Sequence, residues 1–206
     1  MKWSRKTSNG IAYHYSVNAS DSVNEKSTPI VFIHGVGLRA ESWYQQLSVF
    51  TKHYHCYAID MPGHGESDLL SNPVLTLEDF SDVLTTFINN VVGQPAIIVG
   101  HSLGAMMALQ TAVSFPKVVL GIAALNAIYN RPDEAAQNVQ ARAESLINDL
   151  NQNVTEQPIA RWFDGNPKYR SEAELCQKWL DNGSRLGYAR AYQMFAHLRG
   201  ITEADL

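Results

Sequence analysis

The chain has 206 residues, of which 45% are hydrophobic, and carries a formal net charge of −4 at pH 7. This length suits one domain plus an insertion, and the charges are dispersed, which argues against a nucleic-acid partner. No window approaches the roughly 18 consecutive apolar residues of a membrane-spanning helix, and no apolar stretch follows the basic N-terminus. We therefore expect a cytoplasmic protein without a membrane partner.

Short apolar runs alternate with helical patterns along the first part of the chain. The runs that predict strands are Trp3–Thr7, Ile11–Val17, Pro29–Ile33, His55–Ile59, Ala96–Val99 and Val118–Leu125. The segments between them that predict helices are Ala40–Lys52, Leu77–Val92 and Leu103–Phe115. This alternation is typical of βαβ units and predicts an α/β fold with a mostly parallel, doubly wound sheet.

The texture changes near Tyr129, after which helical patterns follow one another with no strand between them. The predicted helices are Pro132–Leu150, Ile159–Phe163, Ser171–Leu180 and Arg185–Leu198. We therefore divide the chain into a core at residues 1–128 and a helical layer at residues 129–206. The two cysteines lie far apart without metal-ligand spacing, so we expect free thiols and no metal site.

Residues 100–104, with the sequence GHSLG, carry the strongest chemical signal. They follow a predicted strand and open a predicted helix, which is the context of a nucleophile elbow. Glycines on both sides of Ser102 allow the strand and helix to pack closely, and the helix N-terminus favours an oxyanion. A chance Gly-Ser turn is the alternative, and the strand and helix in register disfavour it. Ser102 is therefore the predicted catalytic nucleophile.

The segment His34–Gly37 follows an earlier strand and precedes a helix, where a second oxyanion donor is expected. We assign the two donors to the N–H groups of Val36 and Leu103. A plain glycine turn is the alternative for this loop. His34 itself is interpreted as a structural residue that hydrogen-bonds the loop.

The loop Asp60–Ser67 follows another strand and is rich in proline and glycine. It contains an acid and a histidine, which suggest catalytic residues at first sight. We interpret it instead as a loop that organises the backbone at the strand end.

Together these three loops resemble the α/β-hydrolase superfamily over about the first 126 residues. The resemblance implies an α/β-hydrolase fold with a helical cap inserted after the sixth strand, and no metal or organic cofactor. Within the cap, the runs at Arg161–Phe163 and Gly187–Ala189 resemble the 3-oxoadipate enol-lactonase branch. That branch closes its cap over a small carboxylated lactone, which implies substrate-binding roles for Arg161 or Trp162. The preferred alternative is that Trp162 and Phe163 are ordinary core and that Arg161 is a solvated charge.

A serine hydrolase of this family also needs an acid and a histidine, in that order after the serine. In the family both follow the cap, on loops after the seventh and eighth strands. The sequence given ends at Leu206, and beyond the elbow only His197 follows Ser102, in a predicted helix. At the sixth strand end stands the uncharged Asn126. Either the chain is part of a longer hydrolase, or it is a natural variant whose serine is not activated.

The leading hypothesis is a serine hydrolase that acts on a small-molecule carboxylic ester or lactone through an acyl-enzyme at Ser102. Residues 1–206 alone are expected to be inactive, and to associate through the uncovered sheet edge at Val118–Leu125. A non-catalytic protein that binds a small ligand on the same fold is the alternative. Other branches, such as carbon-carbon bond hydrolases, share every motif named above.

Overall fold

The computed structural model describes residues 4–16, 27–150 and 156–200. Its sheet has six strands in the order β1-β2-β4-β3-β5-β6. The pairs β1–β2 and β2–β4 are antiparallel, whereas β4, β3, β5 and β6 run parallel. The strands are β1 (Ser4–Ser8), β2 (Ile11–Ser16), β3 (Pro29–Ile33), β4 (His55–Ile59), β5 (Ala96–His101) and β6 (Val119–Leu125). The sheet is therefore mostly parallel, as the sequence predicted.

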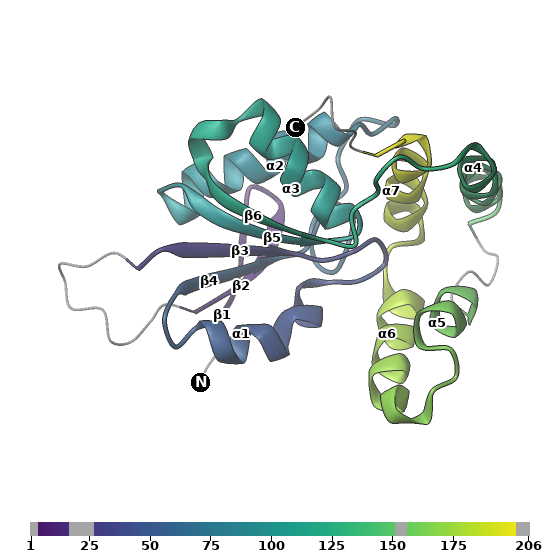
Figure 1. Cartoon of the computed structure of the whole chain (residues 1–206), viewed down its shortest axis with the longest axis horizontal. Coiled ribbons are helices and arrows are strands. Elements are labelled where there is room, and N and C mark those ends of the chain that lie inside the picture. The colour runs from purple at the N-terminus through teal and green to yellow at the C-terminus, as the bar shows by residue number, and fades with distance from the viewer. Residues whose placement is uncertain (1–3, 17–26, 151–155, 201–206) are drawn as a thin grey trace.

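Helices cover both faces of this sheet. The short helix α1 lies on one face, whereas α2 and α3 lie on the other, and α4 to α7 stand beside the ends of the parallel strands (Figure 1). The α-helices are α1 (Tyr44–Phe50), α2 (Leu77–Phe87), α3 (Leu103–Ser114), α4 (Asp133–Asn148), α5 (Glu156–Phe163), α6 (Arg170–Asn182) and α7 (Arg185–His197). The shorter helices are η1 (Ala40–Trp43), η2 (Ile88–Val92), η3 (Pro116–Val118) and η4 (Pro167–Tyr169).

The element boundaries agree closely with the sequence prediction. The strands Pro29–Ile33 and His55–Ile59 are found with the predicted ends. Trp3 and Val17, which were assigned to the first two strands, lie outside the described residues. The single helix predicted to end at Val92 is instead an α-helix that changes into a π-helical turn at Ile88.

Local signals explain where α2 begins and where its π-helical extension ends. The Thr76 side chain accepts a hydrogen bond from Asp79 N–H, and the Asp79 carboxylate accepts one from Thr76 N–H. This capping box satisfies two amide groups that the first helical turn leaves without partners. At the other end Gly93 adopts φ 74°, the left-handed conformation that favours glycine after a helix.

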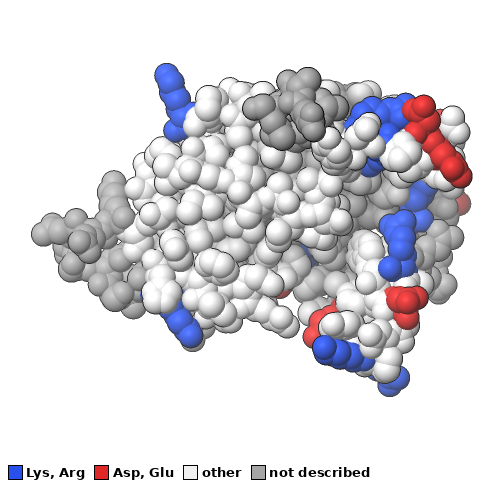
Figure 2. All heavy atoms as spheres, viewed as in Figure 1, with Lys and Arg blue, Asp and Glu red and all other residues white. Residues whose placement is uncertain are grey.

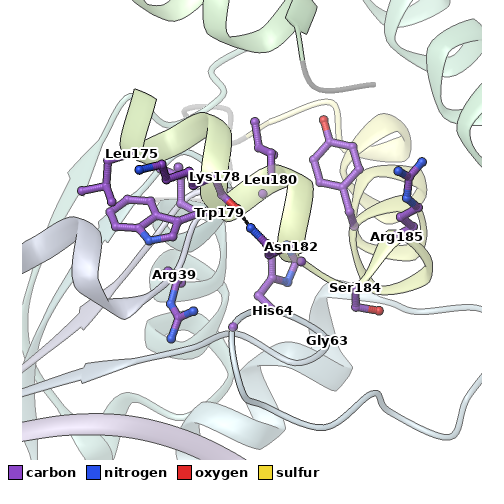
Figure 3. Close-up of a pocket in the computed structure, with 15 residues that line it drawn as sticks. Arg39, Gly63, His64, Leu175, Lys178, Trp179, Leu180, Asn182, Ser184 and Arg185 are labelled. Carbon is purple, nitrogen blue, oxygen red and sulfur yellow. Dashed lines mark hydrogen bonds between the residues drawn. The ribbon is translucent and has the colours of Figure 1, made fainter. Parts of the chain in front are cut away.

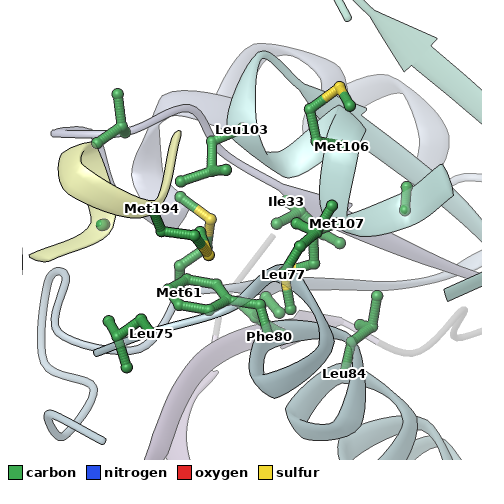
Figure 4. Close-up of a cluster of buried hydrophobic side chains, with 14 of the residues drawn as sticks. Ile33, Met61, Leu75, Leu77, Phe80, Leu84, Leu103, Met106, Met107 and Met194 are labelled. Atoms are coloured by element: carbon green, nitrogen blue, oxygen red, sulfur yellow. The ribbon is translucent and has the colours of Figure 1, made fainter. Parts of the chain in front are cut away.

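The sheet separates two clusters of buried apolar side chains. The smaller cluster lies between the sheet and the helices η1 and α1, around Phe32, Trp43 and Leu47. The larger one lies under α2 and α3 and extends into α7. Figure 4 shows Met194 of α7 reaching this larger cluster between Leu103 and Met61. The first turn of α3, which carries the elbow, therefore rests on a packed base.

The first turn of helix α7 packs against the loop after β4. A Cβ atom built on Gly187 would lie 2.0 Å from the carbonyl oxygen of Gly63, so only glycine permits this approach. A Cβ atom on Gly37 would likewise meet the Leu180 side chain at 2.6 Å and the Tyr188 ring at 2.8 Å. These contacts fix the helical segment against the loops that follow β3 and β4.

The surface carries no dominant block of one charge in the view of Figure 2. Charged side chains of both signs gather over the helical segment, and the part over the sheet and its helices is largely uncharged. Among the described residues, no helix combines the length and the apolar character needed to cross a bilayer.

Candidate active site

Ser102 lies at the sharp turn between β5 and α3, where it has φ 55° and ψ −116°. This conformation is rare for a residue with a side chain and stores local strain. The Ser102 N–H donates to Leu125 O at the end of the neighbouring strand, at 2.9 Å, which ties the turn to β6. The predicted elbow geometry is thus confirmed, and β5 continues to His101, two residues further than predicted.

The glycines around the elbow are required by close backbone approaches. A Cβ atom on Gly100 would lie 2.2 Å from the carbonyl oxygen of Gly104. One on Gly104 would lie 2.5 Å from the carbonyl oxygens of both Ile33 and His34. The turn can therefore be this tight only because both positions lack a side chain.

The two predicted oxyanion donors flank the serine. Leu103 is the first residue of α3, so its N–H has no acceptor within the helix. No backbone hydrogen bond from Val36 N–H is found among the described residues. The loop that carries Val36 passes beside the elbow, because a Cβ atom on Gly35 would lie 3.3 Å from Ser102 Cβ. The start of α3 adds a helix dipole that favours negative charge at this point.

The histidines of the described residues are not hydrogen-bonded to Ser102. Among these residues, no hydrogen bond joins a histidine or carboxylate side chain to the Ser102 hydroxyl. Burial lowers the pKa of the neighbouring His101. His197 ends α7 with an exposed side chain. No described residue is therefore held by a hydrogen bond in position to take the proton of Ser102.

The loop after β4 is organised by one buried carboxylate. Asp60 is fully buried and accepts hydrogen bonds from Ala40 N–H at 2.7 Å and Glu66 N–H at 2.9 Å. It also forms an ion pair with Arg5. The carboxylate thus holds its own loop and the start of η1 together, in agreement with the structural role predicted for this loop.

Glu41 lies beside Asp60 in the same group of ion pairs, and its pKa is strongly lowered. Burial alone would raise the pKa of Glu41, but hydrogen bonds from His14 and Arg39 outweigh it and lower the pKa to about 2. The carboxylate is therefore charged at neutral pH and fixes the Arg39 guanidinium through contacts at 2.6 and 2.9 Å.

A cavity of about 260 Å³ lies where the helical segment meets the loops after β3 and β4. Figure 3 shows Arg39 and Trp179 on one side of it and Ser184 and Arg185 on the other. Its lining contains three cationic side chains and no acidic one, the third cation being Lys178. Ser102 is not among the lining residues, and the cavity reaches the loop after β3 at Gly37.

The two residues proposed from sequence to bind substrate are exposed. Arg161 is exposed, and Trp162 retains 38% of its accessible surface, so its interpretation as ordinary core is wrong. Neither lines the cavity described above. Arg161 does lie close enough to Tyr188 to act on its ionisation, together with Arg142, which hydrogen-bonds the Tyr188 side chain. Burial outweighs both arginines, so the pKa of Tyr188 is raised.

Tyr188 is a residue that sequence reasoning did not assign to the site. It is buried, packs against Gly37 of the loop after β3 and is hydrogen-bonded by Arg142 of α4. Two signals pointed to this position: the run Gly187–Ala189 resembles the enol-lactonase branch, and a glycine inside a predicted helix suggests a packing constraint.

Comparison with known proteins gives consistent results. Residues 30–204 match the family model described as "Alpha/beta hydrolase family". The chain is 38% identical over 171 residues to (E)-2-((N-methylformamido)methylene)succinate hydrolase of Acinetobacter baylyi, covering 82% of this chain and 63% of that protein. It is 32% identical over 98 residues to a pimeloyl-[acyl-carrier protein] methyl ester esterase of Proteus mirabilis, covering 48% of this chain and 36% of that protein. The chain thus spans less than two thirds of the length of these relatives.

Solved structures share the fold at low sequence identity. A hydrolase from Pseudomonas aeruginosa PA01 superposes with a TM-score of 0.73 at 20% identity, over 95% of this chain and 72% of that one. The enol-lactonase from Burkholderia xenovorans LB400 gives the same TM-score at 16% identity, over 94% of this chain and 74% of that one.

Proposed function

Because this chain belongs to the alpha/beta hydrolase family, we propose that it is a serine hydrolase that forms an acyl-enzyme at Ser102. The observation that supports this proposal is the strained backbone of Ser102, which lies at the N-terminus of α3 and beside the loop that carries Val36. Strain of this kind persists where the surrounding structure imposes it, and it concentrates at reactive positions. The proposed substrate is a small carboxylic ester, a lactone, or the amide bond of a related compound.

In the proposed reaction, Ser102 Oγ attacks the carbonyl carbon and its proton passes to a histidine. The carbonyl oxygen becomes an oxyanion, which the N–H groups of Leu103 and Val36 stabilise. Collapse of this intermediate breaks the bond to the leaving group, which takes the proton from the histidine, and leaves an ester on Ser102. Water then hydrolyses that ester by the same steps. We expect the histidine and the acid that orients it to come from sequence beyond residue 206.

We further propose that the substrate carries a carboxylate. The relative with 38% identity is named for a succinate, which is a dicarboxylate. In this chain, Arg142 hydrogen-bonds the Tyr188 side chain, the charge of Arg161 also acts on the ionisation of Tyr188, and the Tyr188 ring packs against Gly37 of the loop after β3. A guanidinium binds a carboxylate through paired hydrogen bonds, and such bonds contribute more than neutral ones.

This substrate class predicts a selective effect of Arg161→Gln in the protein expressed from its complete reading frame. We expect KM for an ester that bears a carboxylate to rise by roughly tenfold or more, since one charged hydrogen bond is lost. The KM for neutral p-nitrophenyl acetate should change little. Lys117→Gln serves as the control. It removes the same charge at an exposed site in η3, next to the end of β6 that lies away from Ser102.

The steady-state comparison decides between two readings. An equal loss of activity of Arg161→Gln towards both esters would argue against the carboxylate site and leave the serine mechanism intact. Absence of turnover of either ester by the unmodified protein would instead favour a non-catalytic ligand-binding protein.

A further inference from the structure

His34 connects the loop after β3 to the loop after β4. The ring is buried, with 1% of its surface exposed. Its Nδ1 lies 2.8 Å from Gly35 O, and Met61 N–H donates to its Nε2 at 2.9 Å. A carbonyl only accepts and a backbone amide only donates, so the two contacts define a neutral ring with its proton on Nδ1.

The Gly35 carbonyl is held by a second donor as well. Leu38 N–H donates to the same oxygen at 3.1 Å. In a trans peptide unit the N–H points opposite to the C=O, and no cis peptide bond occurs in the described residues. The two donors on Gly35 O therefore direct Val36 N–H away from the His34 ring.

The same peptide lies beside the nucleophile. A Cβ atom on Gly35 would lie within 3.3 Å of Ser102 Cβ, which leaves no room for another side chain between loop and elbow. A donor contributes to oxyanion binding only if it is already aimed at the position where charge develops. The orientation of the Gly35–Val36 peptide is thus the property that a supporting residue must fix.

We propose that His34 is a positioning residue for the reaction: through its bond to Gly35 O it aims Val36 N–H at the oxyanion that forms at Ser102. This inference rests on the proposed function. His34 does not touch the substrate, so its effect is expected on kcat, because the oxyanion exists only in the transition state and the intermediate.

The surroundings of His34 preserve the neutral ring that this role requires. Burial lowers its pKa from the ordinary 6.5; the charges of Asp60 and Glu41 oppose this effect, and Arg39 adds to it. The His64 ring lies 5.4 Å away between ring centres, and burial together with His34 lowers the pKa of His64 to about 3. A protonated His34 would place Nε2–H against Met61 N–H, so the contact with Met61 requires a neutral His34 ring.

Two substitutions separate the contacts of His34, in the protein expressed from its complete reading frame. In His34→Asn the amide nitrogen takes the place of Nδ1 and keeps a donor for Gly35 O. In His34→Gln the amide oxygen takes the place of Nε2 and keeps an acceptor for Met61 N–H. We expect His34→Gln to lower kcat by about a hundredfold, as for loss of an oxyanion donor, with little change in KM. His34→Asn should retain clearly more kcat, and His53→Gln, at an exposed histidine, should match the unmodified protein.

Urea denaturation of each variant shows whether the loss of kcat is caused by a lower free energy of unfolding instead. Equal losses of kcat in both His34 variants that track their unfolding midpoints, or no loss in either, would overturn the inference. Absence of turnover in the unmodified protein would overturn the proposed function and the inference with it.

Nitrogen-15 NMR of labelled histidine gives a measurement that needs no substrate. We expect a proton on Nδ1 and none on Nε2 of His34 at neutral pH, whereas a proton on Nε2 would contradict the proposed role.

Discussion

Substitution of Ser102 by alanine is expected to abolish ester turnover by the protein expressed from its complete reading frame. Removal of the nucleophile in a serine hydrolase lowers kcat on the order of a millionfold, because neither the oxyanion donors nor the binding contacts supply a replacement attacking group. The variant should fold normally, since the change removes one oxygen atom and the described residues form no hydrogen bond with it. Steady-state hydrolysis tests the loss of turnover, and urea denaturation of the same preparation tests whether the fold is intact.

Retained activity in the Ser102→Ala variant would contradict the proposed nucleophile. Near-normal turnover with an unchanged unfolding midpoint would mean that another group performs the attack, and the elbow would then have only a structural role. If the variant lost its fold, the comparison would be repeated with Ser102→Gly, which adopts the conformation at φ 55° without strain.

The polypeptide of residues 1–206 is expected to show no turnover that depends on Ser102. A serine hydroxyl without a general base is a poor nucleophile at neutral pH, and loss of the partners of the serine costs about as much as loss of the serine itself. In the described residues no histidine side chain bonds to the hydroxyl. Its p-nitrophenyl acetate hydrolysis should therefore equal that of its Ser102→Ala version.

The same polypeptide is expected to self-associate. Strand β6 is last in the sheet order of the described residues and exposes Leu120 at 58% and Leu125 at 47%. An apolar edge with unpaired backbone groups favours pairing with another chain. Light scattering during the hydrolysis assay gives the mass. A monomer with ordinary esterase turnover would contradict both expectations, and would require a histidine such as His197 to reach Ser102 by a rearrangement.

The sequence predicted the sheet and the elbow well because their signals are local. The strands Pro29–Ile33 and His55–Ile59 are continuous apolar runs bounded by turns, which is how buried parallel strands appear. The elbow needs two glycines at fixed spacing around one serine, and the structure shows that both glycines are required by backbone contacts. A pattern with such a direct steric cause can be read without knowledge of the rest of the fold.

The contacts between the helical segment and the core could not be read in this way. The approach of Gly187 to Gly63, and of Tyr188 to Gly37, joins residues far apart in the sequence. Each contact depends on how two elements pack together, and the only sign of it in the sequence is a single glycine. The exposed Trp162 illustrates the same limit, because its place in an apolar run predicted burial whereas the packing of α5 left it at the surface.

The proton on His34 is a third property beyond sequence reasoning. The residue was predicted to hydrogen-bond its loop, and the structure agrees. Which ring nitrogen carries the proton depends on Met61 N–H, a backbone group of another loop. Its contribution to the orientation of Val36 follows only from the three-dimensional arrangement.

Covalent labelling shows whether Ser102 is an activated nucleophile. The protein expressed from its complete reading frame is incubated with a fluorophosphonate, which reacts with an activated serine and leaves an unassisted hydroxyl unmodified. Intact mass and peptide mapping then locate the adduct. We expect one adduct on Ser102 and none in the Ser102→Ala variant, whereas an unlabelled Ser102 in a folded protein would contradict the proposed serine mechanism.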